Sequence, residues 1–526
     1  MGELSSIALW FCLKLPYFYP KFIRMDTTES FIKAMEKGYA TKGDHIILGA
    51  GMLDGKTVTN AFVKIPLKTL NRHGLIAGAT GTGKTKTLQV LAENLSDKGI
   101  PVLLMDLKGD LSGLAQAAVT NPKLEERHQM IGLPFEGKDF PVEIMTISDQ
   151  KGVRLRATVS EFGPVLLSRI LDLSEVQEGI VAVVFKYCDD HKLPLLDLKD
   201  FKKILQYATR EGKEEFESEY GRISTSSTGT ILRKVLELEQ QGADLFFGEK
   251  SFEVGDLVRI DENGRGYVNI IRLTDIQDRP KLFSTFMLSL LAEIYGTFPE
   301  KGDSEQPELV LFVDEAHLIF DNASKALLNQ IENIVKLIRS KGIGVYFVTQ
   351  NPTDVPEDVL AQLGLKIQHA LRAFTAKDRK AIKLTAQNYP ISEFYDTAEV
   401  LTSLGTGEAL VSALDEKGRP TPLASTMVRA PMSRMDILSD AEIQEVLERS
   451  PLIKKYNEVV DRESAYEILQ EKIERAEVES QKQKQRTQTQ RASTPRASTR
   501  MNPLVKVLTS ATFIRGMMGV LKKVIK

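Results

Sequence analysis

The clearest chemical signal in the chain is a complete G-x-x-x-x-G-K-[ST] loop. It consists of Gly78, Ala79, Thr80, Gly81, Thr82, Gly83, Lys84 and Thr85. The loop follows an apolar run at 75–77 and precedes a helical pattern at 85–98, the context that a phosphate-binding loop requires. Its glycines allow backbone N–H groups to surround phosphate oxygens at a helix N-terminus. We expect Lys84 to pair with the β- and γ-phosphates of a nucleotide and the Thr85 hydroxyl to ligate Mg²⁺.

A second chemical signal is a pair of adjacent carboxylates at the end of a buried strand. Residues 309–313 are all apolar, and Asp314 and Glu315 follow them directly. We expect Asp314 to hold the Mg²⁺ and Glu315 to orient and deprotonate an attacking water, which a hydrolase needs. Strands that end in acidic residues are common, so this interpretation depends on the pairing with the phosphate loop. His317 is expected to be a polar neighbour without a catalytic part.

Gln350 is a third candidate because it ends another apolar strand, 344–349. Ligands of parallel sheets bind beyond the carboxyl ends of the strands, so Gln350 is expected at the same sheet edge as Glu315. There it could sense the γ-phosphate or position the attacking water. The alternative is that Gln350 only caps the loop before Asn351 and Pro352.

Arginines are candidates for completing the site, because a nucleotide bound between subunits can be contacted by an arginine of the neighbour. Arg372, which follows an apolar strand, is the first candidate. Arg379 and Arg339 are rivals, and each of the three can instead be a surface or ion-pair arginine. Lys108 and Asp110 end a further strand, where either could contact the nucleotide or couple to a substrate.

These candidates are positioned by elements whose pattern predicts an α/β fold. Apolar strands alternate with amphipathic helices, which is typical of a mostly parallel sheet covered on both faces. Residues 26–70 read as a small β segment, and 71–150 together with 300–430 as the sheet domain. Residues 151–299 are expected to be mainly a helical insertion, and 431–478 to form C-terminal helices.

The two ends of the chain differ in composition from the rest. Residues 1–25 are expected to be upstream read-through or a flexible leader, with a small hydrophobic anchor as the alternative. Residues 479–503 are rich in Gln, Ser, Thr and Arg and are expected to form a disordered basic linker. In 504–526, apolar residues recur at spacings of three and four, which predicts a basic amphipathic helix. Such a helix could bind a membrane surface, a partner groove or the protein's own body.

The 526 residues have the composition of an ordinary globular protein, with 42% apolar and 27% charged residues. Collagen-like, disulfide-framework and wholly disordered chains are excluded. The net charge of −2 conceals an asymmetry, because residues 481–526 contain eleven basic residues and no acid, whereas the rest carries −13. The near-neutral total therefore does not argue against a nucleic-acid partner. The two cysteines, Cys12 and Cys188, favour a reducing, cytoplasmic compartment.

Several longer strings follow the phosphate loop in a recognisable order. They are Asp-Leu-Lys-Gly-Asp at 106–110, Gln-Gly-Ala-Asp-Leu-Phe-Phe-Gly-Glu at 241–249, Asp-Glu-Ala-His at 314–317, Ile-Arg-Ser-Lys-Gly-Ile-Gly-Val-Tyr-Phe-Val-Thr-Gln-Asn-Pro at 338–352 and Gln-His-Ala-Leu-Arg-Ala-Phe-Thr at 368–375. Over about residues 26–435 the chain closely resembles the bacterial HerA-like proteins of the YjgR type, within the HerA/FtsK superfamily of ring-forming ATPases.

The resemblance implies a RecA-like P-loop core and Mg²⁺-dependent ATP hydrolysis between subunits of a homo-hexamer that acts as a helicase or DNA translocase. By motif it carries over Lys84, Thr85, Asp314, Glu315 and Gln350 as functional residues. One departure is that 26–70 is too short for the full β-barrel that precedes the core in HerA itself, which puts coupling to a DNA-end partner in doubt.

Three functions remain open from the sequence. The first is an oligomeric ATPase that couples hydrolysis to movement along DNA or to unwinding, with DNA resting on the resemblance alone. The second is a nucleotide-gated interaction or scaffold protein for a protein or membrane partner, although Glu315 favours turnover over a pure switch. The third is a peripheral protein-secretion or conjugation motor of the same superfamily.

Overall fold

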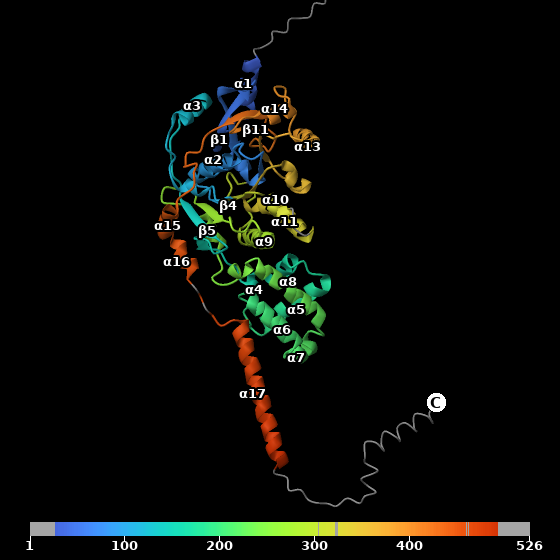
Figure 1. Cartoon of the computed structure of the whole chain (residues 1–526). Coiled ribbons are helices and arrows are strands. Elements are labelled where there is room, and N and C mark those ends of the chain that lie inside the picture. Colours follow the sequence, from blue (N-terminus) through green and yellow to red (C-terminus); the bar gives the residue numbers. More distant parts are fainter. Residues whose placement is uncertain (1–26, 303, 321–324, 459, 461, 493–526) are drawn as a thin grey trace, which may run out of the picture. The chain divides into compact units, whose positions relative to one another are not determined.

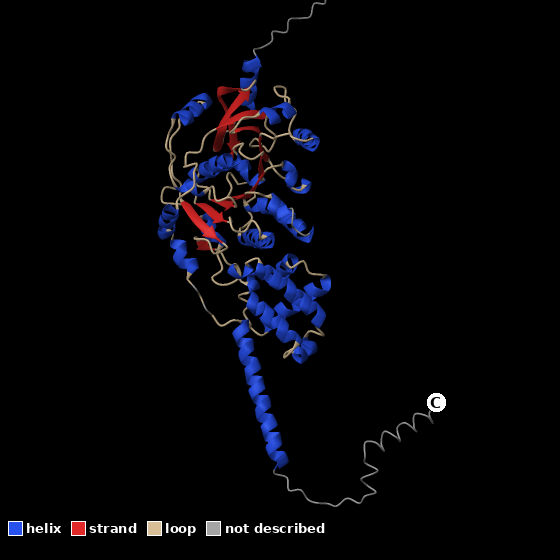
Figure 2. Cartoon of the chain, viewed as in Figure 1, coloured by secondary structure: helices blue, strands red, loops and turns tan. Residues whose placement is uncertain are grey.

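The computed structural model describes residues 27–492 except 303, 321–324, 459 and 461. Within these residues, twelve strands form one sheet, drawn as red arrows in Figure 2. The strands are β1 (His45–Leu53), β2 (Lys56–Pro66), β3 (Gly74–Ala77), β4 (Val102–Asp106), β5 (Val142–Thr146), β6 (Val153–Arg154), β7 (Val268–Arg272), β8 (Leu309–Val313), β9 (Ile343–Thr349), β10 (Leu365–His369), β11 (Glu408–Ser412) and β12 (Ala424–Val428). Their order across the sheet is β2-β1-β12-β11-β10-β3-β9-β8-β4-β7-β5-β6.

Neighbouring strands from β10 to β6 are all parallel, which confirms the mostly parallel α/β sheet that the sequence predicts. β3 leads into the phosphate loop and lies between β10 and β9, and β8 follows β9. Ala77 pairs with Thr349, and Val313 pairs with Phe347. Because these pairs are close to the strand ends, the chain leaves β3, β9 and β8 at one edge of the sheet.

The other four strands extend the sheet in antiparallel fashion, and they include the segment 26–70 that the sequence predicts to be a small β unit. The structure differs there, because the segment begins with helix α1 (Thr27–Gly38) and β1 pairs with β12. Phe31 and Met35, one helical turn apart, are buried in the same core as residues of β1 and β2. The segment therefore continues the main sheet.

Helices lie on both faces of the sheet, as Figure 1 shows. The remaining helices of the described chain are α2 (Lys84–Asp97), α3 (Pro122–Ile131), α4 (Val159–Ile170), α5 (Glu175–Asp190), α6 (Leu198–Thr209), α7 (Lys213–Glu219), α8 (Thr225–Gln240), α9 (Pro280–Thr297), α10 (His317–Phe320), α11 (Lys325–Ile338), α12 (Glu357–Leu360), α13 (Ala376–Gln387), α14 (Thr397–Ser403), α15 (Asp440–Arg449), α16 (Pro451–Asn457) and α17 (Ala465–Ala492). Val310 and Phe312 of β8 share a buried cluster with Leu88 and Leu91 of α2. α11 packs against α9 and β9. Strands covered on both faces explain the continuous apolar runs in the sequence.

Helices α4 to α8 form the helical region that the sequence predicts within 151–299, and α4 contacts α9 and α11. The same segment also supplies β7, which the sequence pattern does not indicate and which enters the sheet between β4 and β5. The polar Asn269 interrupts the short apolar run of β7. Its side-chain NH2 group donates to Val102 O at 3.1 Å and to Leu257 O at 3.0 Å in the folded sheet. The segment is therefore divided between the helical region and the sheet.

The C-terminal part of the described chain consists of α15, α16 and α17. α17 continues to Ala492, so 479–492 is helical where the sequence predicts a disordered linker over 479–503. Gln, Lys, Arg and Glu are good helix formers even without apolar neighbours. In the preceding part of α17, Glu471 and Arg475 form an i,i+4 ion pair at 2.7 Å. The compact unit that contains the sheet ends at Tyr466, and the rest of α17 belongs to a second unit.

Three further predictions lie outside the described residues, namely those for 1–25, for the end of the linker at 493–503 and for the basic helix at 504–526. Among the described residues, no helix combines the length and the apolar character that crossing a membrane demands. The proposed domain boundaries stay predictions.

A buried carboxylate fastens the segment after β12 to α2, the helix that follows the phosphate loop. Glu93 of α2 is fully buried and accepts hydrogen bonds from the N–H groups of Met432 at 2.8 Å and Ser433 at 2.9 Å. One turn earlier, Gln89 donates to Ser433 Oγ at 2.6 Å and to Arg434 O at 3.0 Å. Burial raises the pKa of Glu93 to about 7, although the donors around it act in the opposite direction. The segment thereby holds α2 against the rest of the core.

We predict that Glu93 makes the free energy of unfolding fall as the pH rises from 6 to 8. Its folded-state pKa lies above the ordinary value of 4.5, so its stabilising contribution is complete at low pH and is lost through about pH 7. Glu93→Gln should reduce the difference in unfolding free energy between the two pH values by about 1 kcal/mol. Urea unfolding at both pH values measures this, with the exposed Glu126→Gln as control. An unchanged difference in Glu93→Gln would refute the assignment.

Candidate active site

The phosphate loop leaves β3 through glycines that its shape requires. Gly78, Gly81 and Gly83 have φ values of 151°, 76° and 112°, a region that favours glycine over other residues. A Cβ atom on Gly78 would lie 2.5 Å from His369 Cβ, closer than two carbons can approach. The chain then enters α2 at Lys84. Glycines in these conformations are what a loop needs to turn its N–H groups toward phosphate oxygens.

Lys84 is buried at the start of α2, and its ammonium donates to carbonyl oxygens of the loop itself. Nζ lies 2.7 Å from Gly78 O and 3.3 Å from Ala79 O. Burial and the charge of Lys108 lower the pKa of Lys84, while the charges of the carboxylate pair after β8 act in the other direction. The structure therefore brings the loop lysine within the electrostatic reach of both carboxylates.

Segments distant in the chain hold the loop, two of them directly and a third through one of these two. The Ala79 N–H donates to Ala370 O at 2.8 Å, just beyond β10, and the Gly407 N–H donates to Thr82 O at 2.9 Å. Arg127 of α3 in turn donates to Gly407 O at 2.5 Å. Sequence reasoning does not find Arg127 or Gly407, because both are distant from the loop in the chain. The one local hint of Gly407 in the sequence is the Gly-Thr-Gly string at 405–407, which predicts a turn before β11.

Asp314 and Glu315 follow β8 directly, as the sequence predicts, and their side chains are only 4% and 10% exposed. Glu315 has a left-handed φ of 46°, and the Ala316 N–H donates to Val348 O at 3.0 Å. Burial raises the pKa of Asp314 to about 7, against the opposing charge of Lys108. A carboxyl in such surroundings needs a nearby cation to be fully ionised at neutral pH.

Lys108 supplies one cation to this pair from the loop after β4. Its ammonium forms an ion pair with Glu315 Oε1 and lies 3.9 Å from Asp314 Oδ2. On the other oxygen of the same carboxylate, His317 Nδ1 lies 3.3 Å from Glu315 Oε2. Lys108, which the sequence names as a residue that could contact the nucleotide, therefore contacts the carboxylates.

The residues expected to hold Mg²⁺ suit that ion. Asp314 Oδ2 is buried and has no hydrogen-bond partner among the described residues. Thr85, the second residue of α2, offers a partly buried hydroxyl. Carboxylate and hydroxyl oxygens are hard ligands, and Mg²⁺ commonly combines one or two protein ligands with waters and phosphate oxygens. The donor set therefore fits Mg²⁺.

Gln350 and the three candidate arginines differ in how near they lie to the phosphate loop and the carboxylate pair. Gln350 directly follows β9, which lies between β3 and β8, so it leaves the sheet between the phosphate loop and Glu315. Arg372 is exposed and lies two residues beyond Ala370, which contacts the loop. Arg339 precedes β9 and lies at the opposite end of that strand from Gln350, and Arg379 is exposed on α13. Their catalytic roles stay predictions.

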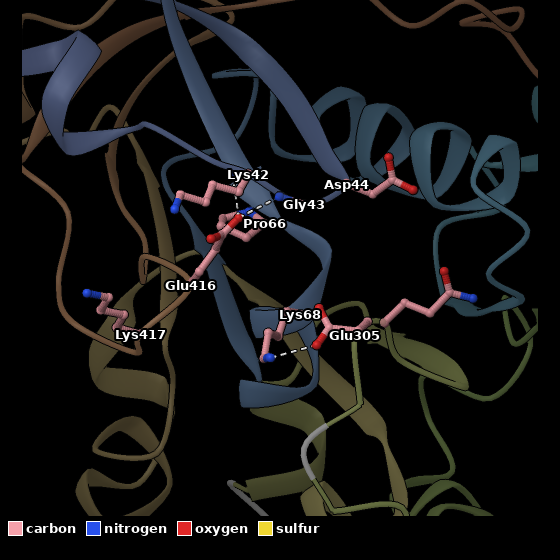
Figure 3. Close-up of a pocket in the computed structure, with 9 residues that line it drawn as sticks. Lys42, Gly43, Asp44, Pro66, Lys68, Glu305, Glu416 and Lys417 are labelled. Atoms are coloured by element: carbon pink, nitrogen blue, oxygen red, sulfur yellow. Dashed lines mark hydrogen bonds and ion pairs between the residues drawn. The ribbon is translucent and has the colours of Figure 1, made fainter.

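A pocket of about 460 Å³ lies away from this site, at the amino end of β8 (Figure 3). Within it, Lys68 pairs with Glu305 at 2.7 Å, and Glu416 accepts the backbone N–H groups of Lys42 at 2.6 Å and Gly43 at 2.7 Å. The phosphate loop and the carboxylate pair lie instead at the carboxyl ends of their strands. The pocket is therefore not part of the candidate nucleotide site.

Comparison with solved structures shows the fold. The bacterial conjugative coupling protein TrwB, in the form TrwBdeltaN70, superposes with a TM-score of 0.51 at 15% identity, over 77% of this chain and 94% of that chain. The core is thus of the RecA-like P-loop type that the sequence resemblance implies, with β3 central and β9 between it and β8.

Comparison of sequences adds curated relatives. The DNA double-strand break repair helicase HerA of Sulfolobus acidocaldarius is 24% identical over 363 residues, which is 68% of this chain and 66% of that protein. The protein of the same name from Saccharolobus solfataricus is 24% identical over 398 residues, 74% of this chain and 70% of that protein. The chain thus spans about two thirds of the length of these relatives.

A family model described as Helicase HerA-like C-terminal matches residues 52–522. The narrower resemblance to the YjgR type stays a prediction. Because the match covers most of its length, the chain belongs to the HerA-like helicase family.

Proposed function

We propose that this protein hydrolyses ATP with Mg²⁺ and uses the energy to move along or unwind DNA as a homo-oligomer. The observation that carries the proposal is the meeting of the phosphate loop and the carboxylate pair at one sheet edge. The charges of Asp314 and Glu315 both act on Lys84, although about 230 residues separate the two motifs in the chain. A chain that only bound nucleotide would not need a second, largely buried carboxylate there.

Binding of the nucleotide would exchange the hydrogen bonds of Lys84. Its ammonium donates to Gly78 O and Ala79 O in the structure. Phosphate oxygens would compete with these carbonyls for the ammonium, and the loop N–H groups would surround the phosphates. Thr85 and Asp314 would hold Mg²⁺, which neutralises charge on the phosphates. Because Lys84 is already buried beside the loop, it needs little rearrangement to reach them.

Glu315 would accept the proton of the attacking water. Glu315 follows β8, and Gln350 follows the neighbouring strand β9. Gln350 is therefore proposed to orient the same water or to sense the γ-phosphate. The exposed Arg372 is proposed to reach the nucleotide of a neighbouring subunit, where its charge would stabilise the transition state.

DNA is proposed as the track because the curated relatives are named as DNA double-strand break repair helicases and the family model as helicase-like. An oligomeric DNA motor needs basic residues only on the surface that contacts the DNA. The net charge of −13 on residues 1–480 therefore does not argue against DNA. The alternative, a nucleotide-gated scaffold for a protein or membrane partner, predicts a different response to DNA.

We predict that phosphate release requires Mg²⁺ and rises when double-stranded DNA is added. Lys84→Ala and Glu315→Gln should each lower kcat by about 100-fold or more. Only Lys84→Ala should also weaken nucleotide binding, because Glu315 acts on the water and not on the nucleotide. Phosphate release with and without DNA, together with nucleotide affinity, measures these effects.

The matched control is Glu308→Gln, since Glu308 precedes the same strand β8 at its opposite end and pairs with Lys301 at 3.2 Å. Its turnover should equal that of the wild type. Full turnover in Glu315→Gln would contradict the assigned base. Turnover that ignores DNA, with assembly that still depends on nucleotide, would favour the scaffold function.

We predict that Arg372 acts across a subunit boundary. Arg372→Ala and Lys84→Ala should each be nearly inactive alone, whereas mixed oligomers should regain activity where an intact Lys84 meets a neighbour's intact Arg372. Phosphate release over a series of mixing ratios measures the recovery. Absence of recovery would place Arg372 in its own subunit's site, and Arg379→Ala in the same scheme tests the rival.

A further inference from the structure

Lys108 stands out because it pairs with the residue proposed as the catalytic base. Its ammonium contacts Glu315 Oε1 and lies 3.9 Å from Asp314 Oδ2, while its side chain is 37% exposed. The two carboxylates, by contrast, are largely buried. The ammonium therefore lies at the boundary between the buried carboxylates and the space outside them.

The loop that carries Lys108 is built to hold its position. The buried carboxylate of Asp106 accepts three backbone N–H groups, from Gly109 at 2.7 Å, Asp110 at 3.2 Å and Leu111 at 3.2 Å. Gly109 has a left-handed φ of 77°, which closes the turn. A further bond runs from Gln277 Nε2 to Leu107 O at 2.7 Å. Lys108 thus extends a flexible side chain from a rigid backbone.

Two ammonium groups gather at this edge of the sheet. Lys84 begins α2 directly after the phosphate loop, and Lys108 pairs with the carboxylates that follow β8. Lys84 reaches the edge from β3 and Lys108 from β4, on either side of β9 and β8. Two cations on the two sides of one site suit a ligand with several negative charges, such as the terminal phosphate of a nucleoside triphosphate.

We propose that Lys108 senses the γ-phosphate by exchanging partners. The ammonium pairs with Glu315 Oε1 and so occupies the oxygen that would take a proton from water. A bound γ-phosphate, with its greater charge, draws the ammonium away and frees that oxygen. A nucleoside diphosphate does not reach it, so Glu315 stays paired after phosphate release. This inference rests on the proposed function and adds a residue that couples the triphosphate to the base.

The test compares the affinities of the full-length protein for ADP and for the non-hydrolysable analogue AMP-PNP, both with Mg²⁺. Lys108→Met keeps the length of the side chain and removes its charge. It should weaken AMP-PNP binding about tenfold, the effect of one lost charge-assisted hydrogen bond, and change ADP binding less than about twofold. Lys108→Arg should retain most of the preference for AMP-PNP, because it keeps the charge.

A second variant tests the exchange itself. Glu315→Gln removes the competing carboxylate, so it should tighten AMP-PNP binding about fivefold where Lys108 is present and have no effect in the Lys108→Met background. An effect of equal size in both backgrounds would overturn the exchange.

Lys138→Met is the matched control, since Lys138 is similarly exposed, at 40%, and pairs with Asp97 at 2.6 Å near the far end of α2. It should leave both affinities unchanged. Equal losses of ADP and AMP-PNP binding in Lys108→Met, or no loss of either, would overturn the inference. A wild-type protein that binds AMP-PNP but does not hydrolyse ATP would instead overturn the proposed function, so the two failures are distinguishable.

Discussion

The parallel hydrogen-bond ladder of β3, β9, β8 and β4 is the constraint on which the candidate site depends. Parallel strands end at the same edge, so the ladder delivers the phosphate loop, Gln350, the carboxylate pair and the Lys108 loop to one place. None of these groups would meet without it, because they are scattered from residue 78 to residue 350. The fully buried strands therefore position the site as well as stabilise the fold.

This geometry brings two lysines and two carboxylates together at that edge of the sheet. Lys84, Asp314 and Glu315 are buried, so an unpaired charge on any of them is costly, and the partly exposed Lys108 pairs with the two carboxylates from the rim. Lys84 donates to loop carbonyls and Lys108 pairs with carboxylates, and phosphate oxygens are stronger acceptors than the carbonyls that Lys84 contacts. Two cations positioned at one edge of the sheet suit a polyphosphate ligand.

Local signals predict most of the parallel sheet and place the phosphate loop and the carboxylate pair at the ends of its strands, as the structure has them. The glycine-rich loop requires specific residue types at fixed spacing, and Asp314 and Glu315 follow an uninterrupted apolar strand, so both are visible in the sequence. The sequence predicts disorder at 479–492 because apolar content is low there, whereas helix propensity acts without burial. β7 was missed because Asn269 is acceptable there only through tertiary hydrogen bonds. Arg127, Gly407 and the partner of Lys108 are long-range contacts, and a single sequence carries no record of them.

The most direct measurement is a crystal structure of Glu315→Gln with ATP and Mg²⁺. We expect the phosphates within the loop 78–85, the Lys84 ammonium on the β- and γ-phosphates, and the metal between Thr85 and Asp314. A water in line with the γ-phosphate should lie within hydrogen-bond distance of residue 315. Nucleotide bound elsewhere, or phosphates in the loop with residue 315 too far away to contact that water, would contradict the assignment of this edge as the hydrolytic site.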